Sequence, residues 1–270
     1  MFILAGGLFL SSAEAASLRV EQAKVRVAVL PGDAKSGRAA LFNPSDKAAN
    51  VEVYVEDWTF SSALDGSKTF YPPGTTELSC ARWISFAPAQ FTIAPFGKEE
   101  IKYTVHCPQD AAGAHFAVMF FETALGNAVD EEGVGVSVRG RLGVLFYVEP
   151  RGTIKKEAKL DNLQITENGQ AVDIQLDFVN NGNTDIYPEG TFYIMDNKGV
   201  IVARGKFEKA YTLPGDEITL SSSISPGNVS KLLPGEYDLV ITIDLGDLPK
   251  VVEAELKIAA SGKISCSLRE

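Results

Sequence analysis

The residue types that most often carry catalysis are sparse in this chain. Its 270 residues include two histidines, His106 and His115, and three cysteines, Cys80, Cys107 and Cys266. Each histidine stands at the end of a predicted strand, and no G-x-S-x-G motif is present to suggest a hydrolase triad. An enzyme is therefore the class that the sequence supports least, and we expect no catalytic residue.

Spacings typical of metal and cofactor sites are also missing. The sequence has no C-x-x-C, no H-x-x-x-H and no complete EF-hand loop. The Gly-rich stretch of residues 124–136 is followed by no helix that could hold a phosphate. The net charge is -10, from 25 basic and 35 acidic residues, without a basic cluster. We therefore expect no metal, cofactor, small-molecule substrate or nucleic-acid partner.

The N-terminus predicts export. An uncharged apolar run over residues 2–10 precedes Ala13 and Ala15, which stand at the -3 and -1 positions of a signal-peptidase site. A membrane anchor would need about 20 apolar residues. We therefore interpret residues 1–15 as a cleaved signal peptide and expect a periplasmic or cell-surface protein.

The rest of the chain predicts strand after strand. Short segments of alternating polarity end at Pro, Gly and Asn turns, and no convincing amphipathic helix appears. A polar segment that begins at Glu149 resembles a linker. We expect an all-β protein of two tandem immunoglobulin-like sandwiches, residues 16–150 and 151–260, followed by a tail of residues 261–270.

Residues 133–150 predict one strand of unusual length. Their even positions are apolar apart from Gly140, whereas the odd positions before Leu145 are Gly, Ser or Arg. Such a strand would reach about 50 Å, well beyond the usual length of about 5–6 residues. Two interpretations stay open. The apolar residues pack in a core, or the strand is an edge that adds to a partner's sheet.

Two cysteines are placed so that they could pair. If residues 82–93 and 98–106 form a hairpin that turns at residues 94–97, Cys80 and Cys107 lie nearly opposite each other. In an exported protein this arrangement favours a disulfide. Two unpaired buried thiols are the alternative, and Cys266 has no visible partner.

The layout of the first sandwich resembles the periplasmic pilus-assembly chaperones, which consist of two immunoglobulin-like domains. The resemblance covers most of residues 16–150. It is carried by the segments "VRVAVLPG", "VEVYVEDW", "WISFAPAQFTIAPFGKEEIKYTV", "HFAVMFFET" and "VRGRLGVLFYVEP". In that family the last strand of the first domain is lent to a pilin that lacks its own final strand. By resemblance, the donor residues are Val134, Val136, Val138, Leu142 and Val144.

The family also clamps the pilin's terminal carboxylate with basic residues. Phe146-Tyr147 match a Phe-Tyr pair of the family, but Val144 stands where the family has Lys. Arg26, Arg139 and Arg141 are the candidate carboxylate anchors, because arginine can grip a carboxylate with two hydrogen bonds. The alternative is that they are outward-facing, solvated side chains.

Two functions follow from these observations. The first is a non-enzymatic, exported chaperone that binds pilin-like or other surface subunits by strand donation, with a membrane usher as a candidate further partner. The second is a structural or adhesive cell-surface module that binds wall polymer or a protein. A chaperone needs the side chains around Val134–Val138 exposed or capped, whereas a structural module would bury them.

Overall fold

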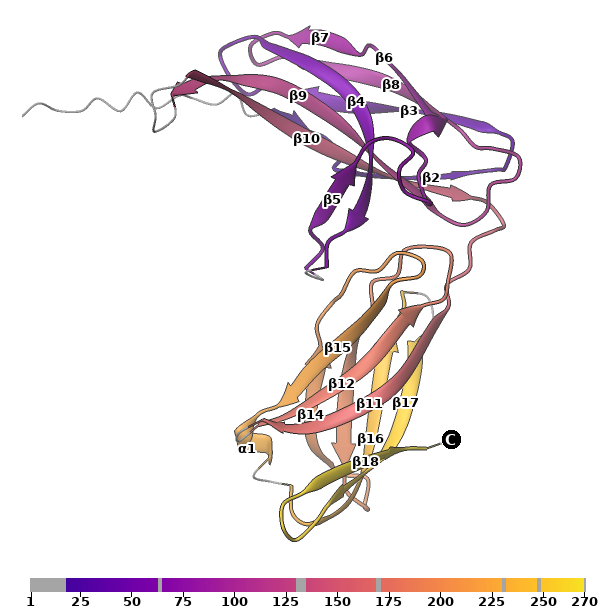
Figure 1. Ribbon diagram of the computed structural model, residues 1–270, viewed down its shortest axis with the longest axis vertical. Coiled ribbons are helices and arrows are strands. Elements are labelled where there is room, and N and C mark those ends of the chain that lie inside the picture. Colours follow the sequence, from indigo (N-terminus) through magenta and orange to yellow (C-terminus); the bar gives the residue numbers. More distant parts are fainter. Residues whose placement is uncertain are drawn as a thin grey trace, which may run out of the picture. The chain divides into compact units, whose positions relative to one another are not determined.

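The computed structural model describes residues 18–62, 65–129, 135–168, 171–229, 232–246 and 249–269 (Figure 1). The predicted signal peptide, residues 1–15, lies outside these ranges. Regular structure within them is almost entirely β, which confirms the predicted all-β fold of two sandwiches. No described helix is long and apolar enough to cross a bilayer.

The chain divides into two compact units. The first unit contains the chain up to Asp57 with Tyr71–Gln109 and Phe116–Val148, and the second contains Trp58–Phe70, Asp110–His115 and the chain from Glu149. The boundary expected between residues 150 and 151 stays a prediction.

The first unit is built on two packed sheets. One sheet has the order β1 (Arg19–Val20), β3 (Ala34–Phe42), β8 (Lys98–His106), β6 (Ile84–Ala87). The other has the order β2 (Lys24–Val29), β10 (Gly135–Pro150), β9 (His115–Val129), β4 (Ala49–Phe60), with β7 (Gln90–Ile93) also paired to β4. The last strand in this order, β5 (Lys68–Tyr71), belongs mostly to the segment Trp58–Phe70 that is counted with the second unit. Tyr103 of β8 meets Phe146 of β10 edge-on, with ring centroids 4.9 Å apart, so aromatic packing joins the two sheets.

The second unit is also a sandwich of two sheets. Its smaller sheet has the order β11 (Ala158–Asn168), β12 (Ala171–Asn180), β15 (Glu217–Ile224). Its larger sheet has the order β14 (Ile201–Phe207), β13 (Glu189–Met195), β16 (Gly235–Asp244), β17 (Pro249–Ile258), β18 (Ile264–Leu268), and a short helix α1 (Pro226–Val229) precedes β16. The segment expected as a tail therefore forms a strand, because β18 pairs with β17 and Cys266 packs against the core.

A buried carboxylate fixes the loop that leads into β6. Asp57, at 0% exposure, lies in β4, and its Oδ2 accepts hydrogen bonds from the backbone N–H groups of Thr75 (2.7 Å) and Thr76 (2.8 Å). Its Oδ1 accepts a 2.5 Å bond from the Ser79 hydroxyl. The loop thus satisfies the buried charge, and the charge holds the loop in place.

The predicted disulfide is corrected, since Cys80 and Cys107 are both free and buried thiols. The expected hairpin does not form, because β6 pairs with β8 whereas β7 pairs with β4 in the other sheet. Ile84 lies opposite Val105, so continuing this register would bring Cys107 opposite Arg82. Cys80 instead donates its backbone N–H to the Phe116 carbonyl, and burial raises the pKa values of both thiols.

Removing the Asp57 carboxylate should destabilise the first unit. We expect Asp57→Ala to lower the free energy of unfolding by about 3 kcal/mol, because the backbone N–H groups of Thr75 and Thr76 and the Ser79 hydroxyl lose their common acceptor. Urea unfolding measures this change. The control is the exposed Asp46→Ala, which should shift stability little, and equal effects of the two substitutions would contradict the role of Asp57.

All three cysteines should react as thiols once the protein is unfolded. We expect alkylation of the purified, denatured and unreduced protein to label Cys80, Cys107 and Cys266, because all three are free thiols. The two buried cysteines donate their backbone N–H groups to different residues, Cys80 to Phe116 and Cys107 to Asp33. Intact-mass spectrometry counts the labels. A single label would show a disulfide and overturn the described pairing of β6 and β7.

Candidate binding edge on strand β10

The apolar alternation of β10 continues from the core into solvent. Its even-numbered residues form what we call the inner face, which is continuous with the core between the two sheets. Phe146 and Val144 on this face are buried, Val144 to 1% exposure. Leu142 is half-buried and Val138 is 40% exposed. One strand thus serves as core at its C-terminal half and presents apolar surface at its N-terminal half.

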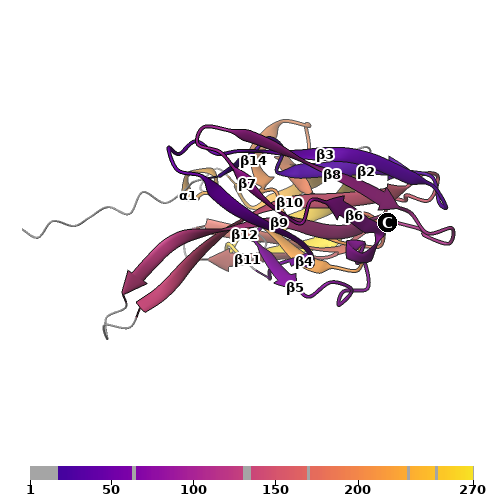
Figure 2. The same cartoon turned by 90° about the horizontal axis from the view of Figure 1, so that it is seen from above.

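The strand is long because it forms an extended hairpin with β9. β9 has 15 residues and β10 has 16, and Figure 2 shows their connected ends extending beyond the other strands of the first unit. An isolated two-stranded ribbon is marginally stable in water. The projecting part therefore depends on its own side-chain contacts and on whatever docks against it.

One edge of β10 is covered along only part of its length. The neighbours of β10 in the sheet are β9 and the six-residue β2. The Leu145 N–H donates to the Ala23 carbonyl (2.9 Å), and the charged groups of Lys24 and Arg26 both lie over the Tyr147 ring. β2 therefore runs beside the C-terminal half of β10. We call the edge of residues 135–142 that faces away from β9 the free edge, because no strand in the described ranges pairs with it.

The predicted donor residues fall into three groups. Val134 lies outside the described residues, and Val136 lies on β10 although its side chain is not described. Val138 and Leu142 are on the inner face beside the free edge. Val144 belongs to the core of the first unit. We correct its assignment as a donor, because a side chain packed between the protein's own sheets cannot insert into a partner.

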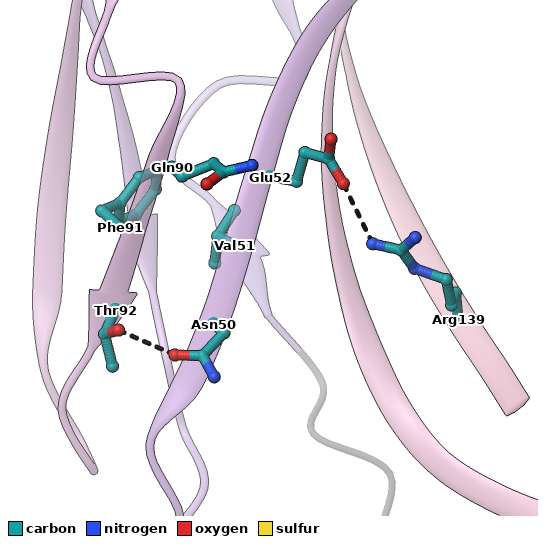
Figure 3. A pocket seen from close by; sticks show the side chains of 7 residues that line it. All are labelled: Asn50, Val51, Glu52, Gln90, Phe91, Thr92 and Arg139. Atoms are coloured by element: carbon teal, nitrogen blue, oxygen red, sulfur yellow. Dashed lines mark hydrogen bonds and ion pairs between the residues drawn. The ribbon is translucent and has the colours of Figure 1, made fainter.

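The odd-numbered side chains of β10 form an outer face with ion pairs. Arg139 lies 3.1 Å from Glu52 of β4 (Figure 3), and it lies 2.7 Å from Glu122 of β9. The guanidinium of Arg141 lies 3.4 Å from Glu56 and 4.2 Å from the Phe120 ring centroid. Exposed pairs of this kind contribute little each, but together they link three strands where the hairpin leaves the sandwich.

Tyr54 completes this outer face. Its hydroxyl donates a 2.7 Å hydrogen bond to Glu122, and its ring lies 5.6 Å from that of Phe120. Burial raises the pKa of Tyr54, and the bond to Glu122 raises it further, so the tyrosine keeps its proton as a donor. A hollow of about 450 Å³ is lined by residues of β4 and β7 and by Arg139, and it includes the ion pair between Arg139 and Glu52. Every buried polar side-chain atom in the described ranges already has a hydrogen-bond partner.

The three candidate carboxylate anchors do not meet at one place. Arg139 and Arg141 pair with glutamates of this chain, whereas the Arg26 guanidinium lies 4.8 Å from the Tyr147 ring centroid. Six residues of strand separate Arg141 from Tyr147, which is about 20 Å. The sequence reasoning missed the glutamates, although the alternation of "VEVYVED" in β4 places Glu52, Tyr54 and Glu56 on one face.

The histidines lie apart from this surface. His106 Nε2 lies 3.3 Å from the Ser85 hydroxyl, and His115 Nδ1 donates to the Gly113 carbonyl at 3.2 Å. Burial lowers the pKa of His115. Within the described ranges, no group of three His, Cys, Asp or Glu side chains is placed to hold a metal ion.

This fold and edge define a class: an all-β, two-sandwich protein with a partly unpaired strand that carries an exposed apolar face. No protein-family model matches the chain, and no curated protein matches it. Solved structures of fimbrial chaperones resemble it at a distance. They include a chain of a chaperone–tip adhesin complex of CFA/I fimbriae (11% identity, TM-score 0.49, 94% of this chain and 99% of that one) and the class 5 fimbriae chaperone CfaA (12%, 0.46, 94% and 99%). A Salmonella enterica structure of the SafA pilin with the SafB chaperone also aligns (14%, 0.42, 87% and 95%).

A charge on the inner face should destabilise the protein strongly at the buried end of that face and little at its exposed end. We expect Val144→Asp to lower the free energy of unfolding by about 3 kcal/mol or more, because it buries an unpaired carboxylate. Val138→Asp should change stability by less than about 1 kcal/mol, since Val138 is partly in water. Urea unfolding of both variants tests this, and similar losses would show that Val138 is a core residue.

Proposed function

We propose that this protein is an exported, non-enzymatic chaperone that binds pilin-like or other surface subunits by lending them the N-terminal half of β10. The observation that carries the proposal is the free edge next to the exposed side chain of Val138. Main-chain N–H and C=O groups on such an edge can pair with a strand of a partner, and the alternating side chains provide specificity.

The chemistry of the surface suits a partner with an incomplete sandwich. A subunit that lacks a strand exposes both an unpaired backbone edge and an apolar groove. The free edge of β10 can satisfy the first, and the inner face can fill the second, because its residues from 138 to 142 carry no charge. The charged outer face would remain in solvent on the far side of the shared sheet.

The resemblance of the first domain to pilus-assembly chaperones agrees with this proposal, and so does the signal-like N-terminus. The family's carboxylate clamp is not part of the proposal, because Arg139 and Arg141 are paired with glutamates and lie far along the strand from Arg26. We infer that affinity depends mainly on backbone pairing and apolar burial. An usher in the outer membrane is a further proposed partner.

Affinity capture from the native envelope tests the proposal. The tagged mature protein should retain a subunit with an incomplete sandwich, identified by mass spectrometry. Val138→Asp should abolish this capture, because the carboxylate would be buried without a partner in the shared core. The control Ser137→Asp puts the same charge on the adjacent exposed residue of the outer face and should capture normally.

Two results would contradict strand donation. Recovery of wall polymer, or of no subunit, would favour a structural or adhesive module. Equal capture by wild type and Val138→Asp would show that the inner face does not contact the partner.

A further inference from the structure

The inner face of β10 has a gap in its series of side chains. Val138 and Leu142 are large and apolar, but Gly140 between them has no side chain. A glycine weakens a strand interior and often marks a place that another group approaches closely. Gly140 is not one of the glycines with a positive φ. Its backbone conformation therefore does not require glycine.

Leu125 of β9 occupies the space that a side chain at position 140 would need. A Cβ added to Gly140 would lie 2.9 Å from Leu125 Cδ1, closer than real contacts allow, and 3.2 Å from Cγ, which is a tight contact. Leu125 is half-buried, as Leu142 is. The inner face is thus continuous across the gap, and its middle side chain comes from the neighbouring strand.

We propose that Leu125 is a specificity-determining residue for the client, supplying the apolar contact that Gly140 leaves vacant in the donated strand. This inference rests on the proposed function. It assigns the donor surface to two strands of the hairpin rather than to β10 alone. The Leu125 side chain arises one strand further from the free edge, about 4.8 Å away. The client therefore presents at this position an apolar side chain long enough to cross above Gly140.

The Leu125 contact also explains why the hairpin leaves the sandwich as a pair of strands. Were β10 the sole donor, β9 could end where the core ends. β9 instead continues to Val129, and Leu125 lies in this continuation. The ion pair between Glu122 of β9 and Arg139 of β10, at 2.7 Å, joins the two strands on the opposite face.

A set of three variants tests the inference. The probe is the subunit that wild type captures from the envelope and Val138→Asp does not. Leu125→Ala removes three side-chain carbons and should weaken binding about tenfold, the effect of burying roughly half of that apolar surface against the subunit. Gly140→Val should also weaken binding, because the new side chain displaces Leu125. The double variant Leu125→Ala/Gly140→Val should recover most of the affinity, since valine then fills the vacated space.

The controls separate this inference from folding and from the proposed function. Leu145→Ala, a half-buried leucine on the outer face, should leave binding unchanged, and unfolding midpoints should show that every variant is folded. Unchanged binding by Leu125→Ala, or a double variant no better than Leu125→Ala, would overturn the role of Leu125. If the Leu125 role is overturned in this way but Val138→Asp still fails to bind the subunit, the proposal of strand donation would stand. Normal binding by Val138→Asp would instead overturn strand donation itself.

Discussion

The pairing of a 16-residue strand with a six-residue neighbour is the constraint on which this structure depends. In the described ranges β2 contacts β10 beside Leu145 and Tyr147, and no described strand pairs with the edge of residues 135–142 that faces away from β9. Unpaired edges invite aggregation, and proteins usually blunt them with charges, prolines or bulges. Here the charges Arg139 and Arg141 lie on the outer face, while the inner face stays apolar. Such an arrangement is expected when the edge is kept for a specific partner.

Much of the fold could be predicted from the sequence because alternation is a local property. The pattern of residues 133–150 correctly indicated one long strand, and the succession of short strands indicated two sandwiches. The same pattern could not separate Val138 from Val144. Both are valines on one face, and their different burial depends on where β2 and the second sheet end, which is a tertiary property. The sequence around Cys266 likewise indicates a tail. Its pairing with β17 depends on tertiary structure and cannot be predicted from the residues of the segment itself.

The expected disulfide depends on strand pairing at longer range. The expected disulfide assumed that residues 82–106 form a single hairpin, but the chain changes sheets between Ala87 and Gln90, and local alternation does not record such a change. The assignment of Arg26, Arg139 and Arg141 as carboxylate anchors rests on the family resemblance and stays a prediction. Arg139 and Arg141 meet Glu52 and Glu56 of β4, a strand far away in sequence, and Arg139 also meets Glu122 of the adjacent β9. The even spacing of Glu52, Tyr54 and Glu56 was the signal that could have suggested this pairing.

The two faces of the hairpin have complementary roles, and each depends on the other. Moving β10 by one residue relative to β9 would exchange its faces, placing arginines toward the core and valines among the glutamates. The ion pairs of Arg139 therefore favour the register that keeps Val138 and Leu142 on the apolar side, even though each exposed pair adds little stability. The contact between Gly140 and Leu125 selects the same register, because a shifted β10 would bring an arginine against that leucine. The specificity of the surface thus arises from alignment within the hairpin, before any partner is bound.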